Sequence, residues 1–526
     1  MNKSKGKWKT VIVIILFIFV WLWDVIFAYR YGETYLDADM ASEMVLANKT
    51  NEAGVYLDTD WFYSSEIRIL GQIMLFKPLL LLFPDDWGLV RVIAQAFFLL
   101  AAGLSYIYMT SILGNIRKSI FFAALLLCPF GYWHMWHDCF DGFYLIWIIF
   151  YSFLAGLIFR LSFKRGRYRW LQWMSLVALS FVCGLQSIRV FNNLLIPLAA
   201  AAFIIAYLNL RQTGEDTVFH KVRIFVVTTI SCMCAAVGYF INHKVLSNIY
   251  TYTNQDTRLW QEFSITSLLN LLENFIQLFG YPYNSTQSME ISLFSWLGLL
   301  SCFGILLIVF FVGGFVVGIK KYKIFSAEEK AIFWTAIMAI AVQMVIFAFF
   351  MSQTEFNGSY FLPSLCLYIA LLQIAVTRFS YVDCKRGSAI LSMLILVTAV
   401  LSGINTQLLF LKYPTRSHSE LVKVAETLKE QGYNQVVSTF WRGNNLTELT
   451  DGYVEVWVTH EMNLEYINKC LQSKSHLTTR PYERYAYVYE TEVYNRDESQ
   501  HSLWDNNENA HIVYQDDIYT VVGVEE

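Results

Sequence analysis

Residues 11–43 read VIVIILFIFVWLWDVIFAYRYGETYLDADMASE, an apolar run followed by the acidic stretch LDADMASE at 36–43. A helix needs roughly 20 apolar residues to cross a hydrocarbon core of about 30 Å, and the run before the acids supplies them. The whole chain of 526 residues is 56% hydrophobic and only 15% charged, with a mean hydropathy of +0.42. One soluble core cannot bury that much apolar surface, so we expect a polytopic α-helical membrane protein.

Further apolar segments of the right length recur along most of the chain. We expect about eleven crossings in all. Their approximate ranges are 10–29, 88–112, 118–133, 140–160, 170–184, 188–208, 224–242, 291–318, 331–350, 360–377 and 388–411.

The basic residues give an orientation, because Lys and Arg concentrate in short cytoplasmic loops. Lys3, Lys5, Lys7 and Lys9 precede the first segment, and later basic clusters fall in alternate loops. This pattern predicts a multi-pass protein of the cytoplasmic membrane with its N-terminus inside and the polar tail, 413–526, outside. The net charge of −3 argues against nucleic acid as a partner. The nine cysteines are scattered and indicate no disulfide framework.

Four polar regions fall on the predicted outer side, where recognition or chemistry is expected. They are 30–87, 134–141, 243–290 and 352–363. In the first, Ser64 or Ser65 followed by Glu66 is typical of a helix start, and the apolar spacing after it predicts an interfacial or re-entrant helix. Pro78 and Pro84 are expected to bend or end that helix.

The tail is typical of a small soluble α/β domain. A helix is expected over 421–431, ending at Gly432, and strands over 436–440, 454–458, 485–489 and 519–524. We therefore divide the chain into a transmembrane domain, 1–412, and an extracytoplasmic domain, 413–526.

The acids of LDADMASE have three possible uses: holding a divalent cation, accepting a proton from a nucleophile, or solvation and helix capping. In the simplest interpretation, Asp39 is an N-cap while Asp37 and Glu43 are solvated. Three such acids repel one another unless a cation or a basic side chain lies among them.

The layout of the chain resembles that of the GT-C superfamily of membrane glycosyltransferases, which includes protein O-mannosyltransferases, aminoarabinose transferases and oligosaccharyltransferases. The residues that carry the resemblance are Asp37-Ala-Asp39 with Glu43, the stretch WFYSSEIRI at 61–69, and Ser359-Tyr-Phe-Leu-Pro363. Some relatives carry Arg-Tyr before that proline, whereas this chain has Ser359-Tyr360, so an expected phosphate contact is absent there.

The resemblance implies a transferase that moves a sugar from a polyprenyl-phosphate or diphosphate donor to a hydroxyl of a glycan, lipid or protein acceptor in the cell envelope, with inversion. It makes Asp39 the general base and places Asp37 in the same site. The leaving phosphate needs positive charge. The outward-facing candidates are Arg68, Arg189, Lys244 and Arg258. Arg189 at a membrane boundary has a second interpretation, as a snorkelling side chain or the partner of an acid.

The remaining candidates are assigned to substrate or metal. Substrate contacts are expected from Glu43, Glu66, Arg68, His137, Asp138, Arg189 and Tyr360. A divalent cation, Mg²⁺ or Mn²⁺, would be held by Asp37, Asp39, His137 and Asp138. A second possible metal set consists of His134, His137, Asp138 and Asp141. For most of these residues, capping and solvation are the competing interpretations.

Two other classes of protein remain open. A secondary transporter or flippase of an envelope precursor would show charges within its crossings and pseudo-symmetric halves. A non-catalytic envelope-binding protein would keep its activity in the tail and would not need Asp39.

Overall fold

The computed structural model describes residues 2–164, 168–211, 218–253, 264–280, 294–349, 358–382, 387–412, 416–496 and 507–525. The chain forms two compact units. The first, here called the membrane unit, comprises Met1–Ile26, Ala96–His243 and Asp256–Phe410. The second, here called the loop–tail unit, comprises Phe27–Gln95, Lys244–Gln255 and Leu411–Glu526. The first polar loop therefore lies in one compact unit with the tail.

The membrane unit consists of helices, most of them long and apolar. They are α1 (Asn2–Tyr31), α4 (Trp87–Thr110), α5 (Ile116–Leu127), α6 (Tyr132–Trp136), α7 (Phe143–Phe163), α8 (Arg169–Gln186), α9 (Ile196–Arg211), α10 (Val218–Lys244), α11 (Ile265–Gln277), α12 (Trp296–Lys321), α13 (Ala327–Phe349), α14 (Leu365–Val382) and α15 (Gly387–Lys412). Within the described residues, nine helices are long and apolar enough to cross a membrane, or ten if one bent pair forms a single span. The chain is thus a multi-pass membrane protein.

The predicted count of eleven crossings is not confirmed, and two segments account for the difference. The segment 118–133 is broken, because α5 ends at Leu127 and the next helical stretch, from Tyr132, is bent from it by 92°. Pro129 explains the break, since the residue before a proline favours an extended backbone, and Cys128 has an extended ψ of 118°. The segment 170–184 forms the helix α8, but α8 is not among the nine helices that are long and apolar enough to cross a membrane.

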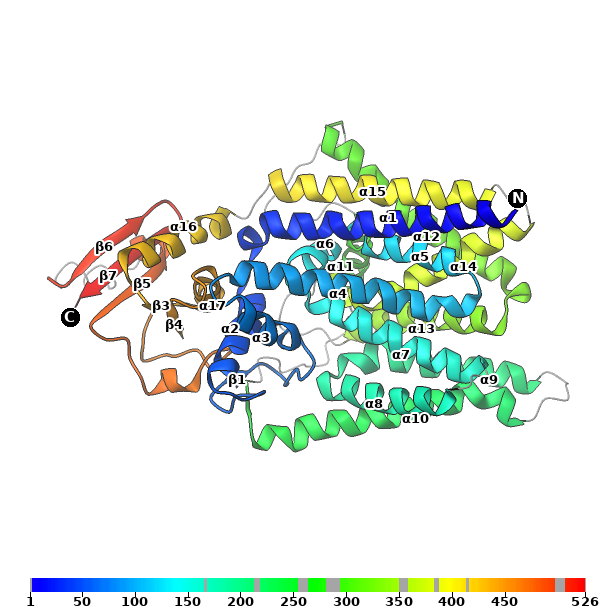
Figure 1. Ribbon diagram of the computed structural model, residues 1–526, viewed down its shortest axis with the longest axis horizontal. Helices are drawn as coiled ribbons and strands as arrows, with labels where there is room; N and C mark the ends of the chain where they lie inside the picture. Colours follow the sequence, from blue (N-terminus) through cyan, green and yellow to red (C-terminus); the bar gives the residue numbers. More distant parts are fainter. Residues whose placement is uncertain are drawn as a thin grey trace. The chain divides into compact units, whose positions relative to one another are not determined.

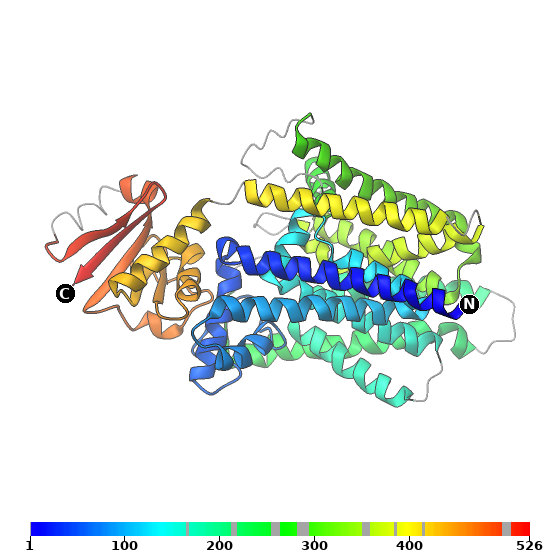
Figure 2. The same cartoon turned by 45° about the horizontal axis from the view of Figure 1, so that its top comes forward.

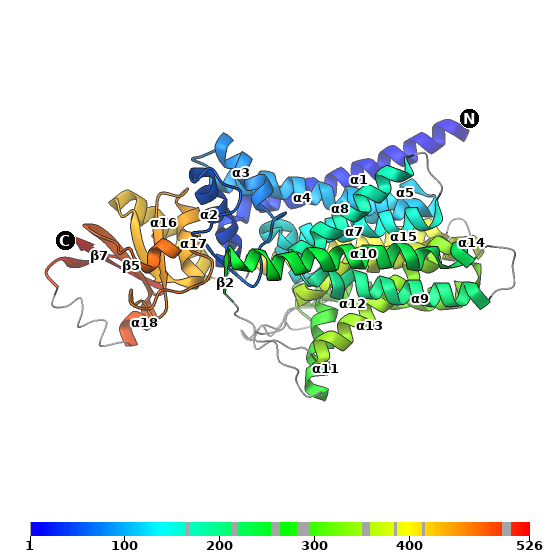
Figure 3. The same cartoon turned by 90° about the horizontal axis from the view of Figure 1, so that it is seen from below.

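The helices pack in neighbouring pairs. α13 packs against α9, α12 against α14, and α7 against α8; α9 and α13 are seen side by side in Figure 3. α1 runs beside α15 (Figure 1), where Trp23 Nε1 donates a hydrogen bond to Gln407 Oε1 at 2.9 Å. This contact joins the first apolar segment to the last one.

The tail folds around a five-stranded mixed sheet. Its strands are β3 (Gln435–Thr439), β4 (Glu455–Thr459), β5 (Arg484–Glu490), β6 (Ala510–Gln515) and β7 (Tyr519–Glu525), in the order β4-β3-β5-β7-β6. β3 pairs in parallel with β4 and β5, while β7 pairs antiparallel with β5 and β6. Figure 2 shows this sheet with the helix α16 (Arg416–Gln431) lying across it. The predicted strands are present, and β6 is an additional edge strand.

Alternating side chains give the sheet two buried faces. Val436 and Val456 face a core shared with Leu421 and Leu428 of α16 and with the helix α17 (Phe440–Leu449). The opposite face carries Val437, Trp457, Tyr487 and Tyr489, and it packs against the short helix α18 (Thr491–Arg496). α16 ends where predicted, because Gly432 adopts φ +78°, a left-handed conformation that favours glycine.

The first loop contributes α2 (Ala38–Glu52), β1 (Phe62–Tyr63) and α3 (Ile73–Leu82) to the loop–tail unit. β1 pairs in parallel with β2 (Thr251–Tyr252), and Trp61 forms an antiparallel bridge with Ser473. The prediction of a helix starting at Ser64 or Ser65 is therefore wrong. Pairing with two distant segments holds the chain extended, so the helix begins only at Ile73 and includes Pro78.

Candidate functional site

Asp37, rather than Asp39, is the N-cap of α2, the helix that begins within the acidic stretch LDADMASE. Asp37 has an extended backbone (φ −119°, ψ 168°), and its Oδ1 accepts a hydrogen bond from Met40 N at 2.9 Å. The simple interpretation that Asp39 is the N-cap is therefore wrong. A cap at Asp39 would require α2 to begin at Met40, but α2 begins two residues earlier, at Ala38. Asp39 therefore lies inside the first turn, and the capping position belongs to Asp37.

Asp39 is exposed in the first turn of α2. Its backbone oxygen accepts a hydrogen bond from Ser42 Oγ at 2.7 Å. Its charge acts on the thiol of Cys470 in the tail, whose pKa is raised to about 11, mainly by burial and also by Asp39. The charge of Arg68 opposes that increase. Asp39, Arg68 and Cys470 therefore lie in one electrostatic neighbourhood of the loop–tail unit.

Arg68 is the basic side chain that lies among the acids. Its Nη1 is 3.2 Å from Oε1 of Glu43, which lies one helical turn after Asp39. Both side chains are partly buried, with exposed fractions of 26% for Arg68 and 13% for Glu43. Glu43, Arg68 and Glu66 also line one small pocket with Ser42 and Tyr63. Its volume of about 20 Å³ has room for a single water molecule.

The second predicted acidic region lies in the membrane unit and forms two His–Asp pairs. His134 Nε2 is 2.8 Å from Asp138 Oδ2, and His137 Nδ1 is 2.5 Å from Asp141 Oδ2. All four side chains are buried. Each pair has the i, i+4 spacing, and the turn ends at Gly142, whose φ of +70° allows the chain to reverse into α7.

The predicted cation ligands are divided between the two units of the chain. Asp37 and Asp39 belong to the loop–tail unit, whereas His137 and Asp138 belong to the membrane unit. Across the described ranges, no group of three or more His, Cys, Asp or Glu side chains is arranged to hold a metal ion. Each histidine instead contacts a carboxylate one turn along its own helix.

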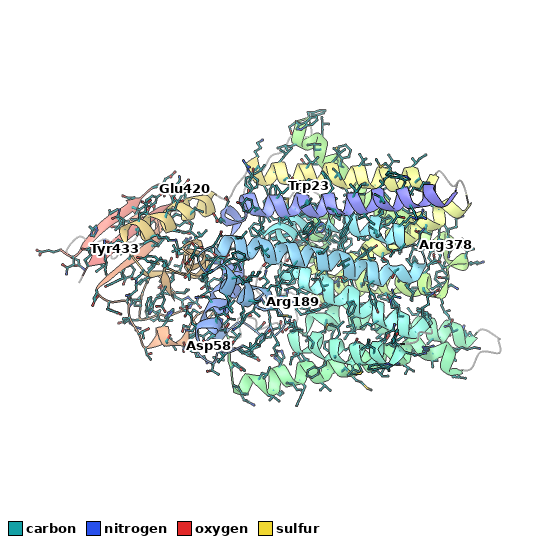
Figure 4. All side chains as sticks on the ribbon, in the orientation of Figure 1. Trp23, Asp58, Arg189, Arg378, Glu420 and Tyr433 are labelled. Atoms are coloured by element: carbon teal, nitrogen blue, oxygen red, sulfur yellow. The ribbon has the colours of Figure 1, made fainter. Side chains whose placement is uncertain are left out.

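Arg189 and Tyr360, two predicted residues from distant segments, come together in the membrane unit. The guanidinium of Arg189, labelled in Figure 4, lies 5.5 Å from the ring centre of Tyr360 and 5.6 Å from that of Tyr144. Arg189 Nη1 also donates a hydrogen bond to the Tyr144 hydroxyl at 2.9 Å. The His137 ring also packs against Tyr144, with 4.3 Å between the two ring centres. Tyr144 therefore contacts two predicted residues, Arg189 and His137, although no sequence signal had singled it out.

The Tyr360 segment carries no arginine of its own but lies beside one. Ser359 is buried in a short helical turn, Gly358–Ser364, and carries no charge. Positive charge reaches Tyr360 from Arg189 instead. Of the two remaining cation candidates, Lys244 is exposed at the last residue of α10, and Arg258 lies outside the described residues.

Asp24 is a buried carboxyl group that the sequence analysis missed. It lies in α1 with no exposed surface, and within the described residues neither of its carboxylate oxygens has a hydrogen-bond partner. Its charge interacts with that of Asp138. The sequence feature that could have revealed Asp24 is its position as a single acid inside the first apolar run, where an ionisable group is costly and often functional.

Comparison with known proteins gives the fold. No family model matches the chain, and no curated protein matches it. The apo crystal structure of ArnT from Cupriavidus metallidurans aligns over 99% of this chain and 98% of its own, at 12% identity and a TM-score of 0.55. The structure of the same protein bound to undecaprenyl phosphate aligns over 98% and 97%, at 11% identity and a TM-score of 0.56.

A third match is the Archaeoglobus fulgidus oligosaccharyltransferase in complex with Zn and sulfate, over 83% of this chain and 62% of that one. Its 12% identity and TM-score of 0.42 add nothing to the assignment. The two ArnT alignments confirm the predicted fold class, a polytopic helical membrane protein with a small C-terminal sheet and an ArnT-like fold.

Proposed function

We propose that this protein is a glycosyltransferase that takes its sugar from a polyprenyl-phosphate or diphosphate donor. The ArnT fold spans nearly the whole chain, and one ArnT structure holds undecaprenyl phosphate. Shared fold alone does not define an activity. The proposal therefore rests mainly on one local observation: Asp39 is exposed at the start of α2, while Asp37 makes the capping hydrogen bond.

Asp39 is proposed as the general base. Its carboxylate accepts the proton of an acceptor hydroxyl as that oxygen attacks the anomeric carbon of the donor. The bond from the anomeric carbon to the phosphate oxygen breaks, and the electron pair leaves with the polyprenyl phosphate or diphosphate. Attack opposite the leaving group inverts the anomeric carbon. An ionised carboxylate at neutral pH suits this proton transfer.

Arg68 and Glu43 are proposed to position this base. The ion pair joins α2 to the segment after β1, and Arg68 offsets the repulsion between the neighbouring carboxylates Asp39 and Glu43. Glu66 on the same pocket completes the polar surroundings. Asp37 contributes through the helix cap, which fixes the backbone from which Asp39 extends.

Arg189 is proposed to bind the donor phosphate. A guanidinium offers several donors in a fixed plane that match phosphate oxygens. Tyr144 and Tyr360 hold that guanidinium at a membrane boundary, and His137 with Asp141 supports Tyr144. No step in this proposal uses a metal ion.

The transfer is proposed to occur on the outer face of the cytoplasmic membrane. The clusters of Lys and Arg in alternate loops support an inside N-terminus, an outside tail and an outside position for the LDADMASE loop. The acceptor is a hydroxyl of a glycan, lipid or protein of the cell envelope.

Replacement of Asp39 by Asn tests the proposal, because the change is nearly isosteric and removes only the base. Host cells that lack the protein are complemented with the parent chain or with Asp39→Asn, and envelope glycans and lipid-linked sugars are compared by mass spectrometry. We expect the parent to restore a missing sugar and Asp39→Asn to reduce its transfer at least about 100-fold, with the lipid-linked donor accumulating.

Two controls accompany this experiment. Asp85→Asn changes an exposed acid of the same loop and should restore the sugar fully. Asp37→Ser keeps a capping side chain without a carboxylate, so it separates the cap from a direct role of Asp37 in transfer. Full rescue by a well-expressed Asp39→Asn variant would refute the base assignment, and unchanged glycans after deletion of the protein would refute transfer altogether.

The buried Asp24 favours a second candidate, a transporter or flippase of an envelope precursor. A carboxyl group within a crossing, interacting with Asp138, is the kind of feature that marks ion or proton pathways. Asp24→Asn would abolish movement of the lipid-linked precursor in that case. Under the glycosyltransferase proposal, the precursor still reaches the outer face in this variant.

A further inference from the structure

A large open cleft lies in the loop–tail unit, on a different side of α2 from the small acidic pocket. Its volume of about 710 Å³ falls within the range of ordinary ligand sites. One wall is a stripe of α2 that includes Asn48, Lys49 and Glu52. The other wall is formed by the tail, mainly by the β4 strand and the segment 472–482. Neither Asp39 nor Arg189 lines this cleft.

The cleft is polar, and its charges balance. Two basic side chains, Lys49 and Arg480, face two acidic ones, Glu52 and Glu455. Amide side chains provide much of the remaining lining, from Asn48, Asn434, Gln435, Asn444 and Gln472. The aliphatic lining is limited to Val45, Ala53 and Val456, and the tryptophans Trp61, Trp87 and Trp457 add aromatic surface. The apolar surface of the cleft is mainly aromatic and is interrupted by charged and amide groups, which suits a sugar ring better than an acyl chain. A polyanion would meet as many carboxylates as cations.

Glu455 is held in place as a hydrogen-bond acceptor. Its Oε1 lies 2.9 Å from His476 Nε2, while His476 Nδ1 lies 3.1 Å from Gln472 Oε1. The His476 ring stacks on Trp457 at 4.7 Å between ring centres. The hydrogen bond from His476 lowers the pKa of Glu455, and the charge of Lys49 across the cleft adds to this effect. Glu455 nevertheless keeps 60% of its side chain exposed, so a ligand can reach it.

Two exposed tyrosines stand on the lining of the cleft. Tyr453 is 42% exposed and Tyr482 is 62% exposed. The backbone of Tyr482 is held at the cleft, because its N–H donates a hydrogen bond to Gln435 Oε1 at 3.1 Å. Flat aromatic faces beside fixed amide and carboxylate groups are suited to a ring that has C–H bonds on its faces and hydroxyls on its edge.

We propose that this cleft binds a neutral oligosaccharide. Glu455 accepts hydrogen bonds from adjacent sugar hydroxyls, amide groups from α2 and the tail bind further hydroxyls, and Tyr482 stacks on a sugar face. The site goes beyond the proposed transfer reaction, since none of its residues is assigned to that reaction. It gives the loop–tail unit a role of its own in holding an envelope glycan.

Direct binding to the purified full-length chain in detergent tests this site. The probes are maltoheptaose, laminariheptaose, mannohexaose and chitohexaose, measured by isothermal titration calorimetry without any sugar donor. Polygalacturonate and a neutral decapeptide serve as probes of other chemistry. We expect at least one neutral oligosaccharide to bind, and Tyr482→Ala and Glu455→Gln each to weaken that binding about tenfold.

Matched variants make the outcome specific. Tyr466 is 59% exposed in the same tail but does not line the cleft, so Tyr466→Ala should leave binding unchanged. Asp39→Asn should also leave binding unchanged, which separates this site from the proposed transfer. Binding without any transferase activity would support the cleft and count against the transferase. The inference is overturned if none of the four oligosaccharides binds, if polygalacturonate or the peptide binds in their place, or if Tyr482→Ala and Glu455→Gln bind as the parent does.

Discussion

Arg91 and Glu448, 357 residues apart in the sequence, form a buried ion pair in which Arg91 Nε lies 2.6 Å from Glu448 Oε1. Arg91 Nη2 makes a second contact with Glu448 Oε2 at 2.6 Å and also donates to the backbone oxygen of Met40 at 3.0 Å. Met40 follows Asp39 directly. The ion pair therefore connects the tail to the first turn of the acidic helix α2.

Breaking this pair is expected to destabilise the loop–tail unit. Arg91→Met leaves the Glu448 carboxylate buried, and burial already raises the pKa of that group. Loss of one partner of a buried pair typically costs about 3–5 kcal/mol. Limited proteolysis of the full-length chain at increasing temperature measures the effect. The control is Lys429→Ala, which breaks the exposed Lys429–Asp451 pair and should cost less than about 1 kcal/mol. Equal proteolysis of both variants would show that the buried pair does not hold the unit together.

The Glu43–Arg68 pair is expected to act as one unit in the proposed transfer. Glu43→Gln and Arg68→Met should each lower kcat/KM about tenfold, since each leaves the other group without its partner near Asp39. The double variant should be scarcely worse than either single variant. Kinetics of all four proteins give the coupling directly. Strictly additive losses would mean that the two residues act independently, and an unchanged Arg68→Met variant would remove Arg68 from the site.

Local sequence signals predicted the parts of the fold that depend on local structure. The apolar segments, the stop of α16 at Gly432 and four of the five strands of the tail all follow from spacing and residue type. The edge strand β6 was missed because most of its side chains are exposed or half-exposed, which leaves no buried alternation to detect. The stretch after Trp61 was mispredicted as the start of a helix, because its strand pairs with residues near 251 and 472 that no local pattern reveals.

In the candidate site, too, the sequence predicted local features and missed those that depend on tertiary contacts. Carboxylates after the first crossing were visible in the sequence, as was Arg189 at a membrane boundary. The identity of the cap was not, because Asp37 and Asp39 are both suitable residue types and only the backbone of α2 decides between them. The role of Tyr144 depends on contacts among Tyr144, Arg189 and Tyr360, which three separate helical segments bring together.

Close packing of α8 on α10 gives a third prediction. A Cβ atom on Gly184 would collide with the backbone oxygen of Ala235, and one on Gly238 with that of Phe181. Ser180 and Ser231 share a hydrogen bond at 2.7 Å in the same contact. Small residues allow helices to approach this closely in a membrane. Gly184→Val should therefore lower the melting temperature and the yield of folded protein in detergent.

Gly313 in α12 is the matched control for that experiment, because a Cβ there would meet nothing within 4 Å. Gly313→Val should retain the parent's yield and melting temperature. If Gly184→Val behaves like Gly313→Val, the two helices do not pack backbone to backbone.

The Glu455–His476 pair gives the loop–tail unit a defined response to acid. The pKa of Glu455 is lowered below its ordinary value of 4.5 in the folded protein, chiefly by the hydrogen bond from His476. A carboxyl group of this kind contributes stability above its unfolded pKa, and the contribution disappears as the pH falls through the lowered value. Since Glu455 is 60% exposed, the contribution should be under about 1 kcal/mol.

His476→Gln should therefore lower the melting temperature of the unit by about 2 °C at pH 6, and the difference from the parent should shrink below pH 4.5. A difference that stays constant or grows on acidification would mean that His476 stabilises the unit through its stacking on Trp457 rather than through Glu455.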